Sequence, residues 1–188
     1  KFFSTKFSKV IGIDNDMRSY FFGNSASVKK NITNLKKQYK NYQHYNIDIR
    51  NFGKLQKVFK KFKNKISFII HSAAQPSHDW AARKPFVDYS INSTGTLNIL
   101  ENFRHYCPNA KLAHLSTNKV YGDRPNFLPI QEKKMRYELK NNNKFYKRGI
   151  DESMSVDNCK HSLFGASKLS ADFYCQEYFK YFNLKIGI

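Results

Sequence analysis

Short apolar runs alternate along the chain with stretches in which apolar side chains recur every three or four residues. An apolar run predicts a strand, whereas the wider spacing predicts an amphipathic helix. The predicted strands lie at 9–14, 42–49, 66–74, 110–117 and 184–188. The predicted helices lie at 26–40, 52–62, 88–107 and 161–182. The runs at 66–74 and 110–117 are apolar almost throughout, which is typical of strands buried on both faces.

This alternation of strands and helices indicates parallel strands joined by right-handed crossovers. The expected fold class is therefore α/β, with a doubly wound parallel sheet. A length of 188 residues suits one domain with its own core, and no internal repeat is visible. The lysine- and asparagine-rich stretch 131–148 has the weakest pattern. We expect it to form a partly helical excursion over the surface.

The strong positive charge raises the question of nucleic-acid binding. Lysine and arginine number 33 against 14 acidic residues, a formal net charge of +19. The lysine pairs at 29–30, 36–37, 60–61 and 133–134 fall in segments that have the pattern of solvated amphipathic helices. Lysine, asparagine and isoleucine are plentiful in a way that an AT-rich coding bias also produces. A solvated basic surface is therefore favoured, and no nucleic-acid partner is expected.

The sequence also bears on membrane association, cellular compartment and metal binding. No run of about 18 apolar residues occurs, and the opening KFFSTKFSKV lacks the apolar centre of a signal peptide. We therefore expect a cytoplasmic protein with no membrane partner. The three cysteines, Cys107, Cys159 and Cys175, are far apart and form no CxxC pair. Neither a disulfide framework nor a metal site is expected.

Two acidic residues follow predicted strands, where nucleotide-binding folds hold their ligand. Asp14 ends the first strand, at the place of an acid that accepts hydrogen bonds from a ribose diol. A turn-forming role in the stretch IDND is the alternative. A carboxylate there favours NAD over NADP, although the nearby Arg18 is of the kind that accepts a 2′-phosphate. Asp48 and Ile49 end the next strand and are weaker candidates for contact with an adenine edge.

Five motifs together carry a family resemblance. They are HSAAQPSHDWA at 71–81, INSTGTLNILE at 91–101, STNKVYGD at 116–123, IDES at 150–153 and HSLFGASK at 161–168. This set resembles the extended short-chain dehydrogenase/reductases, and most of all their nucleotide-sugar epimerases of the CDP-paratose 2-epimerase group. The resemblance implies a Rossmann-like fold and an NAD-dependent enzyme that moves a hydride transiently from a sugar carbon. It also implies a nucleotide-sugar substrate, such as a CDP-sugar, and a homodimer paired through helices 88–107 and 161–182.

The resemblance also implies roles for single residues. Thr117 matches the residue that hydrogen-bonds the sugar hydroxyl, and Lys168 matches the lysine that holds the nicotinamide ribose and lowers the pKa of a catalytic tyrosine. The remaining matches are cofactor-binding positions. They are Asp14, Asn15, Asp48 and Ile49 for adenosine, Ala73, Ala74 and Gln75 for the loop that passes the pyrophosphate, and Asn92 near the cofactor. For Asn92, a purely structural role in capping or kinking its helix is the alternative.

One departure from the family pattern concerns catalysis. Phe164 stands where the family has its catalytic tyrosine, and a phenyl ring cannot exchange a proton. The base has then moved to His161, Tyr121, Tyr146 or Lys168; or the step runs through Thr117 and water; or the protein binds its ligand without turnover. A relocated base is favoured, with His161 as the first candidate because imidazole titrates near neutral pH.

A second departure concerns the ends of the chain. The family begins with a strand and a glycine-rich GxxGxxG turn that holds the pyrophosphate, and no such turn occurs here. KFFSTKF matches the end of the helix that follows that turn, and LKIGI matches a strand that leads into a substrate domain. We therefore expect residues 1–188 to be an incomplete NAD-binding Rossmann domain. The first strand and glycine-rich loop would precede residue 1, and the substrate domain would follow residue 188.

Overall fold

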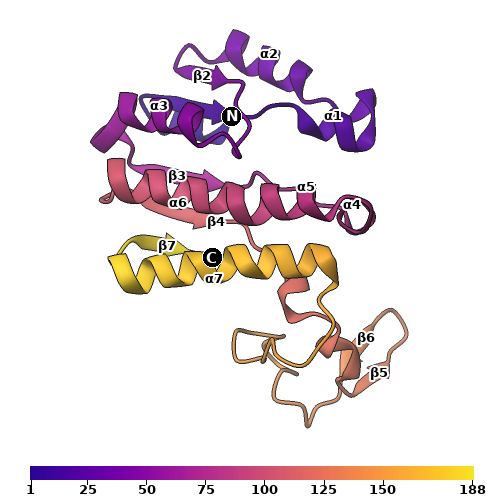
Figure 1. The fold of residues 1–188 in the computed structure, drawn as a ribbon. Helices are drawn as coiled ribbons and strands as arrows, with labels where there is room; N and C mark the ends of the chain where they lie inside the picture. The colour runs from indigo at the N-terminus through magenta and orange to yellow at the C-terminus, as the bar shows by residue number, and fades with distance from the viewer.

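Parallel strands form the centre of the computed structural model, which describes residues 1–188 (Figure 1). The strands β1 (Val10–Ile13) and β2 (Tyr42–Tyr45) pair in one sheet. A second sheet has the order β3-β4-β7, from β3 (Phe68–His71), β4 (Lys111–His114) and β7 (Lys185–Gly187). Every predicted strand contains one of these five, so the α/β class with parallel strands is confirmed.

The helices are α1 (Met17–Phe22), α2 (Lys29–Gln38), α3 (Phe52–Phe62), α4 (His78–Arg83), α5 (Pro85–Tyr89), α6 (Gly95–Tyr106) and α7 (Ser162–Phe182). Helices lie at all four predicted positions, whereas α1 and α4 were not predicted. The predicted helix 88–107 is interrupted by a π-helical turn at Ser90–Thr94 that joins α5 to α6. Short 3-10 turns lie at Phe2–Thr5, Asn24–Ala26, Lys63–Lys65, Asn118–Tyr121 and Arg124–Phe127. No helix is both long and apolar enough to cross a bilayer.

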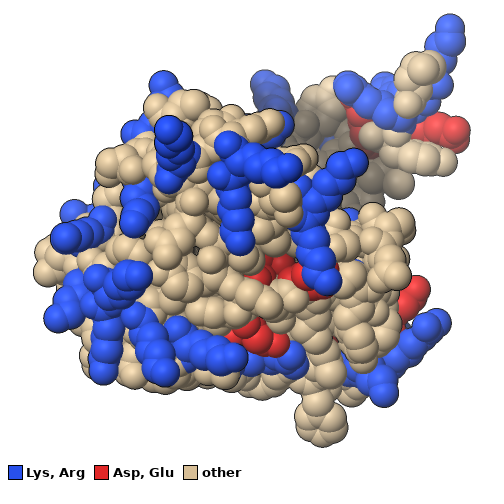
Figure 2. Space-filling model, turned by 90° about the horizontal axis from the view of Figure 1, so that it is seen from above, with Lys and Arg blue, Asp and Glu red and all other residues tan.

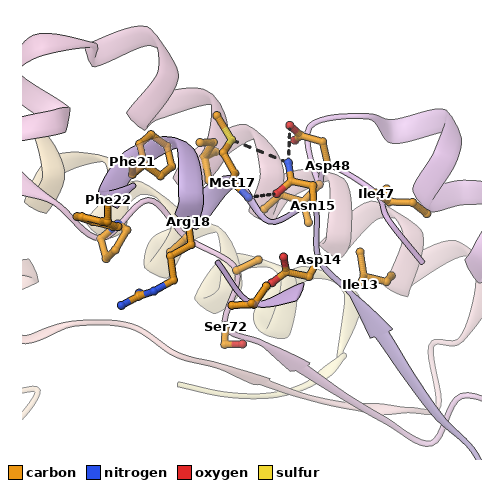
Figure 3. A pocket seen from close by; sticks show the side chains of 16 residues that line it. Ile13, Asp14, Asn15, Met17, Arg18, Phe21, Phe22, Ile47, Asp48 and Ser72 are labelled. Carbon is orange, nitrogen blue, oxygen red and sulfur yellow. Dashed lines mark hydrogen bonds between the residues drawn. The ribbon is translucent and has the colours of Figure 1, made fainter. Parts of the chain in front are cut away.

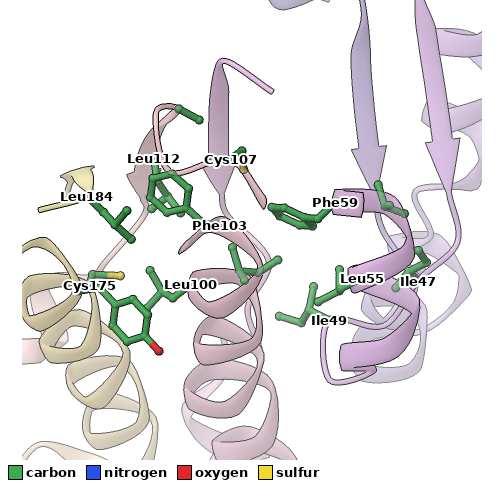
Figure 4. Close-up of a cluster of buried hydrophobic side chains, with 14 of the residues drawn as sticks. Ile47, Ile49, Leu55, Phe59, Leu100, Phe103, Cys107, Leu112, Cys175 and Leu184 are labelled. Carbon is green, nitrogen blue, oxygen red and sulfur yellow. The ribbon is translucent and has the colours of Figure 1, made fainter. Parts of the chain in front are cut away.

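The hydrophobic core lies where α3, α6 and α7 line up in front of the strands (Figure 1). Leu55 of α3 and Leu100 and Phe103 of α6 have no exposed surface, and Cys175 of α7 closes the far side (Figure 4). Burial of each such side chain contributes about 1.5–3 kcal/mol relative to leaving it in water. Asn51 begins α3 by accepting a hydrogen bond from the Lys54 amide at 2.9 Å.

The strand β3 is not buried on both faces, contrary to the prediction. Phe68 and Ile70 are 38% and 41% exposed, whereas His71 is buried. Successive side chains of a strand point to opposite faces, so the core helices cover one set and leave the other open. Phe3 approaches the open face, with its ring centroid 6.2 Å from that of Phe68.

The prediction of a partly helical stretch at 131–148 was also wrong. An antiparallel hairpin of β5 (Ile130–Glu132) and β6 (Tyr137–Leu139) lies there, and it projects away from the layers in Figure 1. The lysine pair 133–134 therefore lies in a hairpin turn and not on a helix. The turn is closed by Lys133 donating its amide hydrogen to the Arg136 carbonyl at 2.8 Å. Short β-forming segments on both sides of a polar turn are the signal that the sequence reading missed.

The basic side chains are solvated, as predicted, on both α2 and α3. Lys29, Lys36, Lys60 and Lys61 are all exposed. Figure 2 shows lysine and arginine side chains spread over this face of the molecule, with a small acidic group among them.

The two parallel sheets do not join. The partner of β1 is β2, and the partner of β3 is β4, so the edges of β1 and β3 that lie toward each other form no ladder. One hydrophobic core, built mainly from α3, α6 and α7, connects the two sheets. Ile11 and Ile13 of β1 pack against this core, and so do Leu112 of β4 and Ile186 of β7.

Candidate functional site

A cavity opens at the carboxyl ends of β1, β2 and β3, beside α1 (Figure 3). Its volume is about 220 Å³. In a parallel α/β sheet, ligands bind at this end of the strands. The cavity brings together six residues that the sequence predicted to contact a nucleotide, namely Asp14, Asn15, Asp48, Ile49, Ala73 and Ala74.

Asp14 lies at the rim of the cavity and is exposed. Its Oδ1 accepts the Asp16 amide hydrogen at 2.6 Å, and its Oδ2 forms no hydrogen bond within the chain. Asp16 has a left-handed backbone and accepts hydrogen bonds from Ser27 Oγ and the Val28 amide. These bonds, the one from Val28 first, lower the pKa of Asp16. Asp14 therefore helps to form the turn and still presents one carboxylate oxygen to a ligand.

Asp48 already has partners within the protein. Arg50 donates to Asp48 Oδ2 from Nη2 at 2.6 Å, and Asn15 donates to the same oxygen from Nδ2 at 3.1 Å (Figure 3). The hydrogen bond from Arg50 is the main reason why the pKa of Asp48 is lowered. The next residue, Ile49, is only 7% exposed, and its side chain packs against Gly95. A Cβ added to Gly95 would lie 2.5 Å from the Cδ1 of Ile49. The Ile49 side chain thus serves the core.

Arg18 lines the same cavity and is exposed, with its guanidinium 5.4 Å from the centre of the Phe22 ring. Figure 3 shows its head extending from α1 away from Asp14. A 2′-phosphate would therefore have to reach outward from the Asp14 carboxylate to meet it.

Gln75 and Asn92 hold the loop after β3 in place. The Gln75 amide donates to Asn92 Oδ1 at 2.8 Å, and Asn92 Nδ2 donates back to the Gln75 carbonyl at 3.1 Å. Asn92 Nδ2 also reaches Ser167 Oγ at 3.0 Å, and the Gln75 side chain donates to Asp88 Oδ1 at 2.7 Å. Both residues are 1% exposed. Asn92 lies in the π-helical turn, a feature that often marks functional sites, and there it ties the loop to α7.

Lys168 points from α7 toward the carboxyl end of β4. It is 5% exposed, and its Nζ donates to the Leu115 carbonyl at 2.8 Å. Burial lowers its pKa from the ordinary value. Thr117 follows on the same loop and begins the 3-10 turn, where its Oγ1 accepts the Lys119 amide hydrogen at 3.3 Å. The loop rests on α7 at Gly165, where a Cβ would lie 2.9 Å from the Lys119 carbonyl oxygen.

Beneath Lys168 lies a group of buried polar side chains that the sequence reading missed. His71 and His114 are register partners on β3 and β4, and their ring centroids are 5.2 Å apart. Burial, followed by the charge of the neighbouring His114, lowers the pKa of His71 to about 3. Burial, followed by the charge of Lys168, lowers the pKa of His114 to about 4. Asp172 accepts from Ser116 Oγ at 2.6 Å. Asp172 lies four residues after Lys168 on the same face of a predicted helix, and this spacing could have indicated from the sequence that the two side chains are neighbours.

Phe164 is 7% exposed and packs its ring at a centroid distance of 4.9 Å from the ring of His78. His161 lies in the loop before α7, with Nε2 2.7 Å from the Val156 carbonyl and Nδ1 facing Gly122. Tyr121 is half-buried in the adjacent turn, and burial raises its pKa. Tyr146 is 40% exposed and belongs to the segment that follows the hairpin.

Comparisons with known proteins identify the family of the chain. The family model for GDP-mannose 4,6 dehydratase matches residues 1–188. CDP-paratose 2-epimerase of Salmonella typhi is 35% identical over 144 residues, which are 77% of this chain and 40% of that protein. UDP-glucuronate 4-epimerase of Thermodesulfobacterium geofontis is 34% identical over 119 residues, which are 63% of this chain and 35% of that protein. The chain thus spans less than half the length of these relatives.

Solved structures of the same kind share the fold. A dTDP-glucose 4,6-dehydratase of Bacillus anthracis in complex with NAD superimposes with a TM-score of 0.65 at 22% identity, over 98% of this chain and 46% of that chain. UDP-glucose 4-epimerase of Thermotoga maritima with UDP-glucose gives a TM-score of 0.62 at 21% identity, over 95% and 45%. The fold is therefore Rossmann-like, as predicted. The chain belongs to the GDP-mannose 4,6 dehydratase family, within the extended short-chain dehydrogenase/reductases that include the nucleotide-sugar epimerases and dehydratases.

Proposed function

We propose that this chain is the NAD-binding part of a nucleotide-sugar epimerase or dehydratase that acts like CDP-paratose 2-epimerase. The observation that carries the proposal is the placement of two sites in one fold. A nucleotide-sized cavity lies at the ends of β1, β2 and β3, and Thr117 and Lys168 lie at the end of β4. The 35% identity to CDP-paratose 2-epimerase supports this class of reaction.

The cavity fits one end of NAD. Its volume of about 220 Å³ is below the range of about 300–1,000 Å³ that is usual for a whole small-molecule site, so it suits the adenosine part and not the entire dinucleotide. The free Oδ2 of Asp14 is an acceptor for a ribose hydroxyl, and the small side chains of Ala73 and Ala74 leave room along the loop. Gln75 and Asn92 would hold that loop in place. Their side chains would not bind the cofactor themselves, because they are already hydrogen-bonded within the protein.

The catalytic residues would act next to the nicotinamide, whose chemistry is to accept and return a hydride. The Lys168 ammonium would donate to the ribose from its buried position and favour negative charge on a nearby oxygen. The Thr117 hydroxyl would orient the sugar hydroxyl that is oxidised. Because Lys168 already donates to the Leu115 carbonyl, its side chain is fixed before a ligand binds.

The extent of the domain is part of the proposal. We propose that 1–188 is an incomplete NAD-binding domain, with the first strand and glycine-rich loop before residue 1 and the substrate domain after residue 188. The unjoined edges of β1 and β3 support this, since a strand between them would complete one sheet. The limited coverage of the relatives supports it as well.

The proposed substrate is a nucleotide sugar, with a CDP-sugar first, in a cytoplasmic enzyme that pairs with a second copy of itself. Support for the homodimer comes from the exposed aromatic side chains of α7. Tyr174 and Tyr181, which are seven residues apart and lie on the same side of the helix, are both exposed. Exposed aromatic side chains of this kind are enriched at protein interfaces.

A second function is a Rossmann-type protein that binds NAD or a nucleotide sugar without turnover. The observation that favours it is Phe164, which keeps the ring of the family tyrosine in a buried position but has no hydroxyl. The two functions separate in one experiment on the full-length protein that contains this chain. Cofactor absorbance after purification tests NAD binding, and turnover on CDP- and UDP-sugars tests the enzyme. Bound NAD with no turnover on any of them would support the binding protein.

A further inference from the structure

The ring of His78 lies against the side chain that stands in the place of the family tyrosine. His78 is the first residue of α4, and its ring meets that of Phe164 edge to face, with centroids 4.9 Å apart and planes inclined by 62°. Its Nδ1 lies 3.1 Å from Ser162 Oγ at the start of α7. These two contacts, to Phe164 and Ser162, hold the imidazole beside the ring that stands in the place of the family tyrosine.

We infer that His78 is the proton-transfer group of this enzyme, an inference that rests on the function proposed above. Phe164 has no group that exchanges a proton, whereas imidazole both accepts and donates one. Phe164 is buried and His78 is exposed, so a sugar bound at this site has access to the histidine.

The hydrogen bond to Ser162 orients the imidazole for this task. Ser162 Oγ accepts the Gly165 amide hydrogen at 3.2 Å, and the left-handed backbone of Ser162, with φ of 59°, directs its hydroxyl toward α4. When the Nδ1 hydrogen of His78 is donated to Ser162, the lone pair of Nε2 is free, and Nε2 has no hydrogen bond within the chain. A left-handed backbone at a residue other than glycine costs free energy and is found preferentially at functional sites.

The charges around the pair are compatible with a transient positive charge on the ring. Asp88 of α5 is 1% exposed; burial raises the pKa of its carboxyl, whereas the charges of His78 and Lys168 act in the opposite direction. When ionised, this carboxylate stabilises an imidazolium.

The reaction balances with His78 as the base. In the oxidation, His78 Nε2 would take the proton of the sugar hydroxyl as a C=O bond forms, and bound NAD would supply the acceptor for the hydride from the same carbon. In the reverse step, His78 would return the proton to the carbonyl oxygen, and the reduced cofactor would supply the hydride to carbon. Ser162 is a positioning residue, because it acts through the imidazole and touches no substrate.

His161 is the competing candidate, and its surroundings are less suitable. Its Nε2 is used by the Val156 carbonyl at 2.7 Å, and its Nδ1 faces the backbone at Gly122. Nε2 is thus directed at the loop that His161 itself belongs to, and Nδ1, which is buried, is directed at the VYG turn, so the imidazole lies between these two segments.

The test compares His78→Gln with His105→Gln in the full-length protein. His105 is an exposed histidine on α6, 3.3 Å from Glu101, and lies outside the site. With CDP-glucose and UDP-glucose as probes, we expect His78→Gln to lower kcat on the order of a hundredfold or more with unchanged NAD content, and His105→Gln to have no effect. Adding Phe164→Tyr to His78→Gln should restore a large part of the rate, a rescue that a structural role for His78 does not predict.

Further outcomes separate this inference from the proposed function. Spectra of ¹⁵N-histidine-labelled protein report on His78 without turnover: CDP-glucose should shift the resonance that His78→Gln removes and leave the His105 resonance in place. A fully active His78→Gln variant, a lack of rescue, an unmoved His78 resonance, or turnover that appears only with Phe164→Tyr would each overturn the inference. A purified parent without NAD contradicts the proposed function itself.

Discussion

At the scale of single residues, the sequence located candidate functional side chains through short motifs. Thr117 and Lys168 were found because STNKVYGD and HSLFGASK are specific, and the structure places both at the carboxyl end of β4. His78 was not found, although it lies within HSAAQPSHDWA, because its partner Phe164 is 86 residues further along the chain. A contact between residues so far apart in the sequence depends on the packing of α4 on α7, and no local sequence pattern specifies that packing.

Asp14 is expected to select NAD over NADP in the full-length protein. The free carboxylate oxygen accepts ribose hydroxyls and repels a 2′-phosphate, while Arg18 extends away from it. The dissociation constants of NAD and NADP measure the selection. In the Asp14→Asn variant the difference between these two constants should become smaller. Equal or tighter binding of NADP by the parent would contradict this and assign the dominant contact to Arg18.

Lys168→Ala is expected to weaken NAD binding and abolish turnover in the full-length protein. The lost ammonium is buried and fixed by the Leu115 carbonyl, so no other side chain replaces it. Lys180→Ala is the matched control, because Lys180 is on the same helix in an exposed pair with Glu177. Loss of such a pair changes stability by about 0–1 kcal/mol. Cofactor content and rate that are the same in both variants would make Lys168 a structural residue.

At the scale of elements, α7 and the loop after β4 approach each other closely. Gly165 permits it, since a Cβ there would lie 2.9 Å from the Lys119 carbonyl oxygen, a backbone atom that cannot rotate away. Gly165→Ala should therefore destabilise the full-length protein by about 1–3 kcal/mol. Gly53 on α3 is the control, because the nearest atom to its Cβ would be 3.9 Å away.

Gly53→Ala should stabilise by about 0.4–1 kcal/mol, because it removes freedom from the unfolded chain without strain. Melting temperatures of the two variants measure the contrast. Similar melting temperatures for both would mean that the loop after β4 yields easily, and the site would then be less rigid than the geometry indicates.

The histidine pair on β3 and β4 gives the fold a defined pH dependence. The folded-state pKa is about 3 for His71 and about 4 for His114, below the ordinary 6.5. As pH falls below 6.5, the unfolded chain binds protons that the folded chain does not, so stability decreases. From pH 7 to pH 5 each histidine should cost roughly 2 kcal/mol, so the pair should cost on the order of 4 kcal/mol.

Denaturant midpoints at pH 7 and pH 5 measure this loss. His114→Asn should reduce the difference by roughly half, and the exposed His105→Gln should leave it unchanged. An unchanged difference in His114→Asn would show that other groups cause the acid sensitivity.

At the scale of the whole molecule, the sequence predicted the class and order of elements but not their pairing. Apolar runs specify that strands exist, and their alternation with helices specifies that they are parallel. The exposure of Phe68 and Ile70 could not be predicted, because a continuous apolar run fits a strand with two covered faces as well as one with a single covered face. The hairpin at 130–139 was missed because its strands have only three residues each.

The two parallel sheets should differ in stability within the 188-residue chain. The pair β1–β2 is a two-stranded sheet, which is marginal on its own, whereas β4 is the central strand of three and lies on the core of α6 and α7. We expect amide hydrogens of β1 and β2 to exchange through lower-energy openings than those of β4. Equal protection would mean that the shared helices make both sheets one cooperative unit. In the full-length protein, a strand between β1 and β3 would raise the protection of β1 toward that of β4, so the same measurement on both chains tests how the central sheet is completed.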